Sequence, residues 1–557
     1  MRAKTPNFLF LFLFIATLTL ALSCKGKHKR VGEKQVVKKQ EEIAVTVSDI
    51  LESSLDEAEQ KNGRINGVQL REPGVIKYIY SKKEFAPIWT TDSTWLPQAD
   101  SILSFIRQAR NYGLFPEDYN IRRLDTLYRK TVKDPNKETR LDASLWAESE
   151  LLLSSALVNI IGDLKVGRLM ADSTRRKDSS MSPNFYYQQF DSFRLKNSEE
   201  FASSLEPKYP AYARLQDALR QFLSKAKFRS YTKIAMKDSL DFSELIPQRL
   251  AEDSIFVKED TDSDSLAMAT AIKKYQNRKG LRADGKITPE LLSVLNTSDA
   301  DRFVQIAITL DRYKLIPVLP DNYVWVNIPN YTLQVFEGDS VVLKSKVVVG
   351  KPETKTPVLS SSMTDMITYP LWHIPPSIIE KDVLPALKRD AGYLARKGFS
   401  LVDDNGDEVD PYKVKWAKYK KEIPYTVIQG SGDDNALGVI KFNFPNKFSV
   451  YLHDTNQRQF FKKPKRALSH GCVRVEAWKE LASYLLLRDS LNSVNAVKID
   501  SLNTWLAKKQ KRYVPLRKTM PLYIRYVTCE GRDGKLVTYD DVYGDDRRLR
   551  QTYFSSK

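Results

Sequence analysis

Cysteine and histidine are both scarce in this sequence of 557 residues, which holds three cysteines and four histidines. It contains no zinc-finger spacing. Zinc requires three or four ligands at one site, and His453, His470 and Cys472 are one ligand short of a full structural set. We therefore expect no metal and no cofactor, and the rare thiols need another explanation.

Long apolar runs are also missing. The N-terminal run, residues 8–22, has about 15 residues, which is short of the ~20 that span a bilayer. Arg2 and Lys4 precede this run and a small residue follows it, as in a secretory signal. Export is therefore predicted, and no later apolar stretch is expected to span a membrane.

The end of this signal, Ser23 followed by Cys24, resembles the lipobox of bacterial lipoproteins. The resemblance implies that residues 1–24 are a lipoprotein signal peptide, that Cys24 carries the lipid, and that the protein is anchored to a membrane in the periplasm. The basic run 25–39 would supply the second signal that stable anchoring requires. Plain secretion is the alternative.

Acidic residues are too few to balance the basic ones, and the net charge is +19. Such an excess raises the question of a nucleic-acid partner. The sequence has no RNP-like stretch or long basic helix, and acidic residues are mixed among the basic ones. We therefore expect no nucleic-acid partner, and runs such as 25–39 and 508–518 are interpreted as solvated segments.

The first half of the chain has helical periodicity. Residues 25–65, charged and poor in aromatics, are predicted to form a flexible tether, and residues 66–255 a helical scaffold domain. Residues 262–296 resemble the small helical peptidoglycan-binding domain, with a helix, Gly-Leu, Asp-Gly and Thr-Pro-Glu in order. A domain of this kind is predicted over 256–298, with a generic helical hairpin as the alternative.

The second half changes to β-rich runs at 323–328, 331–336 and 341–349, and again at 439–444 and 448–452. A polar insertion of about 370–423 separates the two groups, and it is interpreted as a lid or binding subdomain, with a disordered loop as the alternative. The predicted class is multidomain α+β. A mostly-β domain covers 300–494, and a C-terminal extension covers 495–557.

The stretch LSHGCVRV, residues 468–475, places His470 two positions before Cys472. A thiol is a strong nucleophile only as thiolate, so a catalytic cysteine needs a base or cation in reach. His453 ends a predicted strand 19 residues upstream, far enough for a loop to return the cysteine to it. Either histidine can converge on the thiol, and an inert buried cysteine is the alternative.

Residues 429–476 resemble the catalytic core of the L,D-transpeptidase family, whose signature is a histidine, a spacer, and Ser-His-Gly-Cys followed by an arginine. Residues 369–387 resemble the capping insertion of that family's large subgroup, and 157–169 and 206–219 resemble its N-terminal scaffold. The signature positions in this sequence are His453, Ser469, His470, Gly471, Cys472 and Arg474.

The resemblance implies a role for each position. Cys472 is the nucleophile, and His453 is its base, oriented by a backbone carbonyl such as that of Asp454. Backbone N–H groups around Gly471 and Cys472 form the oxyanion hole. The remaining implied positions are Ser469 and His470, which shape the turn; Arg474, which binds a substrate carboxylate or forms a structural ion pair; and Trp372, Tyr451 and Asp454, which line the substrate groove.

The expected activity is transfer between peptidoglycan stems through a cysteine thioester, from a tetrapeptide donor to a diamino-acid acceptor, giving 3–3 cross-links. An L,D-carboxypeptidase, or attachment of a protein to peptidoglycan, would use the same chemistry. A non-catalytic cell-wall-binding lipoprotein is the alternative from another class. The resemblance also implies that carbapenem-type β-lactams acylate Cys472.

Overall fold

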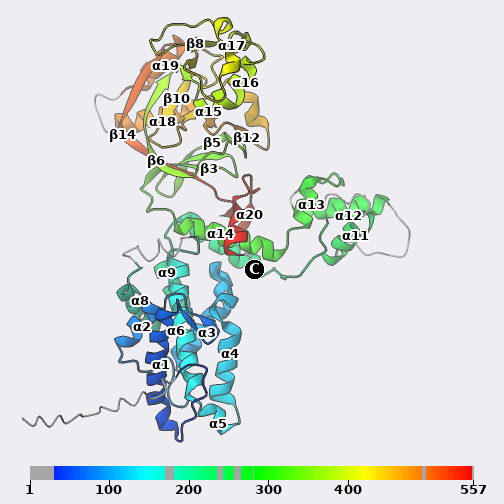
Figure 1. Ribbon diagram of the computed structural model, residues 1–557. Coiled ribbons are helices and arrows are strands. Elements are labelled where there is room, and N and C mark those ends of the chain that lie inside the picture. The colour runs from blue at the N-terminus through cyan, green and yellow to red at the C-terminus, as the bar shows by residue number, and fades with distance from the viewer. Residues whose placement is uncertain are drawn as a thin grey trace, which may run out of the picture. The chain divides into compact units, whose positions relative to one another are not determined.

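The computed structural model describes residues 30–169, 181–234, 242–255, 265–279, 281–491 and 497–554 (Figure 1). Cys24 and the whole signal lie outside these ranges. The chain forms two compact units. The first comprises residues up to 107, 117–161 and 182–196; the second comprises 108–116, 162–181 and 197–557.

The first unit is helical. Its helices are α1 (Ile43–Gln60), α2 (Pro73–Ser81), α3 (Pro97–Arg107), α4 (Ile121–Tyr128), α5 (Lys137–Arg140), most of α6 (Ala143–Lys165), and α8 (Pro183–Leu195). The carboxylate of Glu150, on α6, accepts hydrogen bonds from Tyr80, Thr90 and the backbone of Trp89. A buried carboxylate with this many donors ties the segment before α3 to the central helix.

The predicted tether 25–65 is wrong over most of its described length, because α1 is a core helix. Ile43, Val47, Ile50 and Leu51 are buried, at the 3- and 4-residue spacing of one helix face. The prediction that no later stretch could span a membrane also fails on length and composition. Helix α6 meets both criteria, but 94% of its apolar window is buried inside the protein, as in a core helix.

The small helical domain contains three helices, α11 (Phe242–Glu252), α12 (Ser265–Arg278) and α13 (Pro289–Leu295). Its core includes Ile246 and Leu250 of α11 together with Tyr275 of α12. The domain therefore begins before the predicted boundary at 256, and α11 belongs to it rather than to the scaffold. Thr288 caps α13 by accepting a hydrogen bond from the N–H of Leu291, as its Thr-Pro sequence predicts.

Helix α14 (Asp299–Lys314) precedes the sheet, where the sequence predicted an immediate change to strands. The capping box of Ser298 and Asp301 starts this helix. Its apolar residues pack with those of α10 (Pro210–Leu223) and with the outer face of the sheet, including Trp325.

The large sheet has nine strands in the order β12-β5-β13-β11-β10-β6-β14-β3-β4, and β4 also pairs with β5. The pairing of β4 with β5 closes the sheet on itself, and one buried core fills its interior. The strands are β3 (Asn322–Asn327), β4 (Thr332–Glu337), β5 (Ser340–Gly350), β6 (Leu359–Thr368), β10 (Ile440–Asn443), β11 (Leu452–His453), β12 (Ala467–Ser469), β13 (Val473–Val475) and β14 (Arg512–Arg525).

The C-terminal extension is part of this sheet. Its strand β14 lies between β6 and β3, antiparallel to the first and parallel to the second (Figure 1). The hairpin of β15 (Cys529–Arg532) and β16 (Lys535–Thr538) and helix α20 (Asp545–Tyr553) follow it. The catalytic fold therefore does not end at residue 494, because its central sheet needs a strand from 495–557.

The insertion is a folded subdomain with its own core. Strands β7 (Trp372–His373), β9 (Thr426–Gln429) and β8 (Phe399–Val402) form a sheet, and short helices lie between β7 and β8. Buried apolar residues such as Leu384, Leu401 and Trp416 fill its interior. The interpretation of this insertion as a subdomain rather than a disordered loop is confirmed.

Candidate active site

Strand register places Cys472 opposite Tyr451 and on the same face of the sheet as His453. Strands β11 and β13 are parallel, with Leu452 opposite Val473 and His453 opposite Arg474. Side chains alternate between the two faces of a strand, and Leu452 and Val473 point into the core. Tyr451, His453, Cys472 and Arg474 therefore project from the other face, where one thiol, one imidazole, one phenol and one guanidinium meet.

The Cys472 thiol is half-buried and unpaired. Burial raises its pKa above the ordinary value, while a hydrogen bond from the Tyr451 hydroxyl and the charges of Lys441 and Arg474 oppose that rise. The thiol is therefore mainly protonated at neutral pH, in a setting where two cations and a phenol stand ready to stabilise the thiolate.

The His453 imidazole is 4% exposed and neutral. Burial first, and then the cations Arg474 and Lys441, lower its pKa to about 3, while backbone groups of Asp454 and Leu437 act in the opposite direction. Its Nδ1 is buried without a hydrogen-bond partner of good geometry among the described residues. A neutral ring with a free nitrogen can accept a proton from the thiol during attack.

The Ser-His-Gly-Cys turn is tied internally. Ser469 Oγ donates to the carbonyl of Cys472 at 2.6 Å and accepts from the N–H of Gly471 at 3.1 Å. Gly471 has a φ of 123°, a conformation that side chains rarely adopt, which explains glycine at this position.

The structure offers fewer donors for an oxyanion than the sequence predicted, because the N–H of Gly471 already donates to Ser469 Oγ. The N–H of Cys472 forms no hydrogen bond to another described residue, so it is the donor that is left for an oxyanion. Of the two backbone donors expected around this turn, the structure therefore leaves one open.

Arg474 is held by neutral partners. Its Nη1 donates to Gln457 at 2.7 Å and to Thr455 at 3.3 Å, and its Nε is buried without a partner. It forms no ion pair with any described carboxylate, so the alternative of a structural ion pair receives no support. A guanidinium with an unused donor in a cavity wall can bind a substrate carboxylate.

Asp454 faces away from this cluster. Its Oδ2 accepts hydrogen bonds from the N–H of Val439 and from Arg458, and burial raises its pKa. The carboxylate therefore holds the turn before β10, which is a different task from the predicted contact with substrate.

His470 points toward the capping subdomain, not the thiol. Its Nε2 lies 2.7 Å from Oδ2 of Asp382, which belongs to the insertion. Trp372, also from the insertion, lies next to Tyr451 and has a buried indole nitrogen without a good partner. The subdomain thus touches both sides of the active-site turn.

A cavity of about 1010 Å³ separates the capping subdomain from the sheet. Of the predicted site residues, Trp372, His470 and Arg474 line it, together with Tyr393 and Phe460. Cys472 and His453 are not part of this lining. The thiol therefore lies behind the wall that Arg474 and His470 form.

The sequence interpretation missed Lys441. This residue lies on β10 directly opposite His453, and its Nζ lies 4.1 Å from the centre of the Tyr451 ring. It forms no ion pair among the described residues, and burial lowers its pKa while the neighbouring Cys472 raises it. The alternation of buried Ile440 and Phe442 around Lys441 was the available signal, since it assigns Lys441 to the face of His453.

The C-terminal extension also supports the site. The Tyr543 hydroxyl donates to the carbonyl of Gly350 at 2.8 Å and accepts from the N–H of Thr356. Thr356 in turn donates to the carbonyl of Gly471 at 2.7 Å. Residues 495–557, for which the sequence suggested no role, thus hold the loop that fixes the cysteine turn.

Comparison with known proteins agrees with this geometry. Residues 321–499 match the YkuD family, the L,D-transpeptidase catalytic domain, and residues 75–219 match the Scaffold domain family. A Haemophilus influenzae protein provisionally named as an L,D-transpeptidase is 37% identical over 245 residues, which are 44% of this chain and 48% of the relative. The chain thus spans about half the length of the curated relative that it matches.

Solved structures of similar proteins include an L,D-transpeptidase from Mycobacterium smegmatis, with 13% identity over 37% of this chain and 58% of that chain, and a TM-score of 0.17. Another from Stackebrandtia nassauensis has 14% identity over 56% and 98% of the two chains, and a TM-score of 0.16. This chain therefore contains an L,D-transpeptidase-type catalytic domain at residues 321–499, preceded by a Scaffold domain at residues 75–219.

Proposed function

We propose that this protein cross-links peptidoglycan by transferring one stem peptide to another through a thioester on Cys472. The observation that carries the proposal is the placement of Cys472 and His453 on adjacent parallel strands, with Lys441, Tyr451 and Arg474 around them. A thiol, a neutral imidazole and paired cations are the groups that acyl transfer by a cysteine requires.

In the first step the Cys472 sulfur attacks the carbonyl carbon between the third residue of a tetrapeptide stem and its terminal D-Ala. Because the thiol is protonated and the imidazole is neutral at rest, the proton passes to His453 as the carbon–sulfur bond forms. The Cys472 N–H donates to the oxyanion, and the cation of Lys441 stabilises the charge that develops on sulfur. The carbon–nitrogen bond breaks, and D-Ala leaves with the proton from His453.

In the second step a side-chain amine of a diamino acid on a neighbouring stem attacks the thioester carbonyl. The amine loses a proton to His453, the carbon–sulfur bond breaks, and the thiol is restored. The product is a 3–3 cross-link. Arg474, whose guanidinium lines the active-site cavity, binds a carboxylate of the donor stem, and the Trp372 ring lines the same cavity beside the peptide.

Muropeptide analysis tests this proposal. Overexpression of the full chain in a host without 3–3 links is expected to produce 3–3 dimers, and Cys472→Ser is expected to produce none. The matched control is Cys529→Ser, which removes a thiol in the second unit but outside the site. Tripeptides without dimers would replace the transferase with an L,D-carboxypeptidase, in which water accepts the acyl group.

We further propose that the protein is a periplasmic lipoprotein held at Cys24, on the strength of the lipobox-like sequence and the basic run behind it. Cys24→Ser is expected to move the mature protein from the membrane fraction to the soluble fraction. Continued membrane association of the variant would contradict the lipid anchor.

A further inference from the structure

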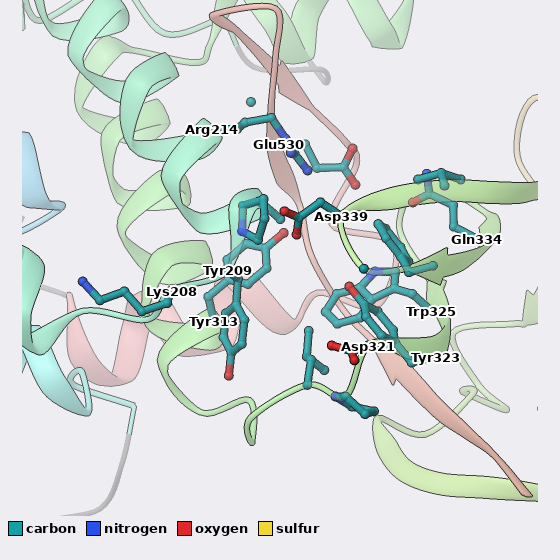
Figure 2. A pocket seen from close by; sticks show the side chains of 18 of the residues that line it. Lys208, Tyr209, Arg214, Tyr313, Asp321, Tyr323, Trp325, Gln334, Asp339 and Glu530 are labelled. Carbon is teal, nitrogen blue, oxygen red and sulfur yellow. The ribbon is translucent and has the colours of Figure 1, made fainter.

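A second cavity, of about 450 Å³, lies apart from the active site and shares no lining residue with the active-site cavity (Figure 2). Four distant segments of the second unit build it: the start of α10, Tyr313 of α14, the stretch from the loop before β3 to β5, and the hairpin strand β15. This volume falls within the range of ordinary small-ligand sites.

Aromatic rings form much of its surface. Figure 2 shows Tyr209, Tyr313, Tyr323 and Trp325 gathered at the cavity. Tyr323 stacks on Phe336 with centroids 4.8 Å apart and planes at 10°, which fixes both rings in place. Rigid, flat, partly exposed rings offer an apolar face without the entropic cost of ordering them on binding.

Unused polar groups surround these rings. Arg214, Gln334 and Asp339 line the cavity, and none of their side chains forms a hydrogen bond or ion pair with another described residue. Glu530, by contrast, is fixed by Arg532 at 2.8 Å and by other donors. The cavity thus presents a positioned carboxylate together with free donors and acceptors.

The charges of the lining nearly cancel. Four cationic side chains and three carboxylates line the cavity: Lys208, Arg214, Lys344 and Arg532 against Asp321, Asp339 and Glu530. A polyanion such as nucleic acid would select a strongly positive wall, and a cation would select a negative one. Mixed charges, an amide and flat rings suit a neutral ligand that has many hydroxyl and amide groups.

The cavity wall is also rigid. A Cβ atom at Gly531 would lie 1.9 Å from the carbonyl oxygen of Arg214, so β15 approaches the backbone of α10 as closely as only glycine allows. The C-terminal hairpin and the end of the scaffold segment are therefore locked together at this point.

We propose that this cavity binds one or two pyranose rings of a neutral, amide-bearing glycan. The C–H face of a ring stacks on Tyr323 and Phe336, while Arg214, Gln334 and Asp339 take up its hydroxyl and acetamido groups. If the proposed function holds, the natural ligand is the sugar backbone of peptidoglycan. The cavity would then bind the sugar at a site separate from the one that reacts with the peptide stems.

Calorimetric titration of the full chain with the tetramer of N-acetylglucosamine tests this proposal. The double variant Arg214→Ala/Asp339→Ala is expected to bind the sugar about tenfold or more weakly, because hydrogen bonds to charged groups are lost. Both positions are exposed and make no hydrogen bond or ion pair with another described residue, so the thermal midpoint is expected to stay unchanged. The matched control is Arg389→Ala/Asp404→Ala on the surface of the capping subdomain, which is expected to bind like the parent.

Equal affinity of the parent and the cavity variant would overturn the proposal, including the case in which all sugar binding resides in α11 to α13. Failure of the parent to bind the tetramer would overturn it too, as would displacement of the sugar by a polyanion such as heparin. The rate of Cys472 acylation by a β-lactam is expected to be the same in all variants. An unreactive Cys472 with intact sugar binding would reject the proposed function and leave this site standing.

Discussion

The second unit contains two free thiols, Cys472 and Cys529, in surroundings that differ in kind. Burial raises the pKa of both, to about 12 for Cys529. Burial therefore does not distinguish a reactive thiol from an inert one, and a rare cysteine is no functional signal by itself.

The neighbours distinguish them. Cys472 lies beside the phenol of Tyr451, the cations Lys441 and Arg474, and the imidazole of His453. Cys529 lies between two threonine hydroxyls, with the carboxylate of Asp546 opposing its ionisation and the guanidinium of Arg302 favouring it, and no imidazole acts on it. A thiol becomes useful where a base can take its proton and cations can hold the resulting charge.

Removing the imidazole of His453 is expected to have the largest effect on the reactivity of Cys472. His453→Ala should lower acylation of Cys472 by about 10²- to 10⁴-fold, the usual contribution of general acid–base catalysis, measured as the rate of adduct formation. His470→Ala, the matched control, should lower the rate only a few-fold, because His470 contacts Asp382 of the insertion. Equal losses for both variants would contradict the assignment of His453 as base.

Deleting the capping insertion is expected to have the second-largest effect on activity. Replacing residues 375–422 with a short glycine linker should lower turnover about 100-fold, because Trp372 and the cavity wall lose their support. The core of the insertion shares no residue with that of the sheet, so the thermal midpoint should fall by only a few degrees. Loss of the cooperative melting transition would show instead that the insertion supports the sheet.

Lys441→Met is expected to make Cys472 more like Cys529. The Lys441 ammonium lowers the pKa of the thiol, so its removal should raise that pKa and reduce the thiolate fraction at neutral pH. The pH profile of alkylation by iodoacetamide measures this shift without any substrate. Lys441→Arg should have a pH profile of alkylation close to that of the parent. If the profile of Lys441→Met is the same as that of the parent, Lys441 does not stabilise the Cys472 thiolate.

The remaining prediction concerns stability in acid rather than reactivity. The folded pKa of His453 is lowered to about 3 from an unfolded value near 6.5, so the unfolded chain binds more protons between these limits. His453 therefore stabilises the fold above pH 6.5, and this contribution falls by about 2 kcal/mol between pH 6.5 and pH 5. Denaturation at several pH values should show that the free energy of unfolding falls less steeply with decreasing pH for His453→Gln than for the parent. An equal dependence on pH for both proteins would contradict a buried neutral imidazole.

The sequence was sufficient to predict what depends on local pattern. The runs at 323–328, 331–336 and 341–349 are strands, because alternating apolar residues suit a sheet with one buried face. The insertion was identified from its polar sequence and the cysteine turn from its Ser-His-Gly-Cys signature. The strand predicted over 448–452 was wrong over most of its length, because β11 comprises only Leu452–His453.

Features that depend on which strands pair in the sheet could not be predicted from the sequence. Strand β14 enters the sheet between β6 and β3, and no local pattern encodes which neighbours a strand will choose. Helix α1 was missed because residues 25–65 were assigned as one segment from their overall charge and lack of aromatics, although the buried face of α1 has regular helical spacing. Lys441 was missed because only the pairing of β10 with β11 places it opposite His453.

The most direct test of the account is to compare the two thiols in one experiment. The full chain is incubated with a carbapenem-type β-lactam and analysed as an intact protein, and the adduct is then mapped by digestion. We expect one adduct, on the peptide containing Cys472, none on that containing Cys529, and almost none in Cys472→Ser. An adduct on Cys529, or one that forms as fast in His453→Ala as in the parent, would contradict the claim that Cys472 and His453 form the reactive pair.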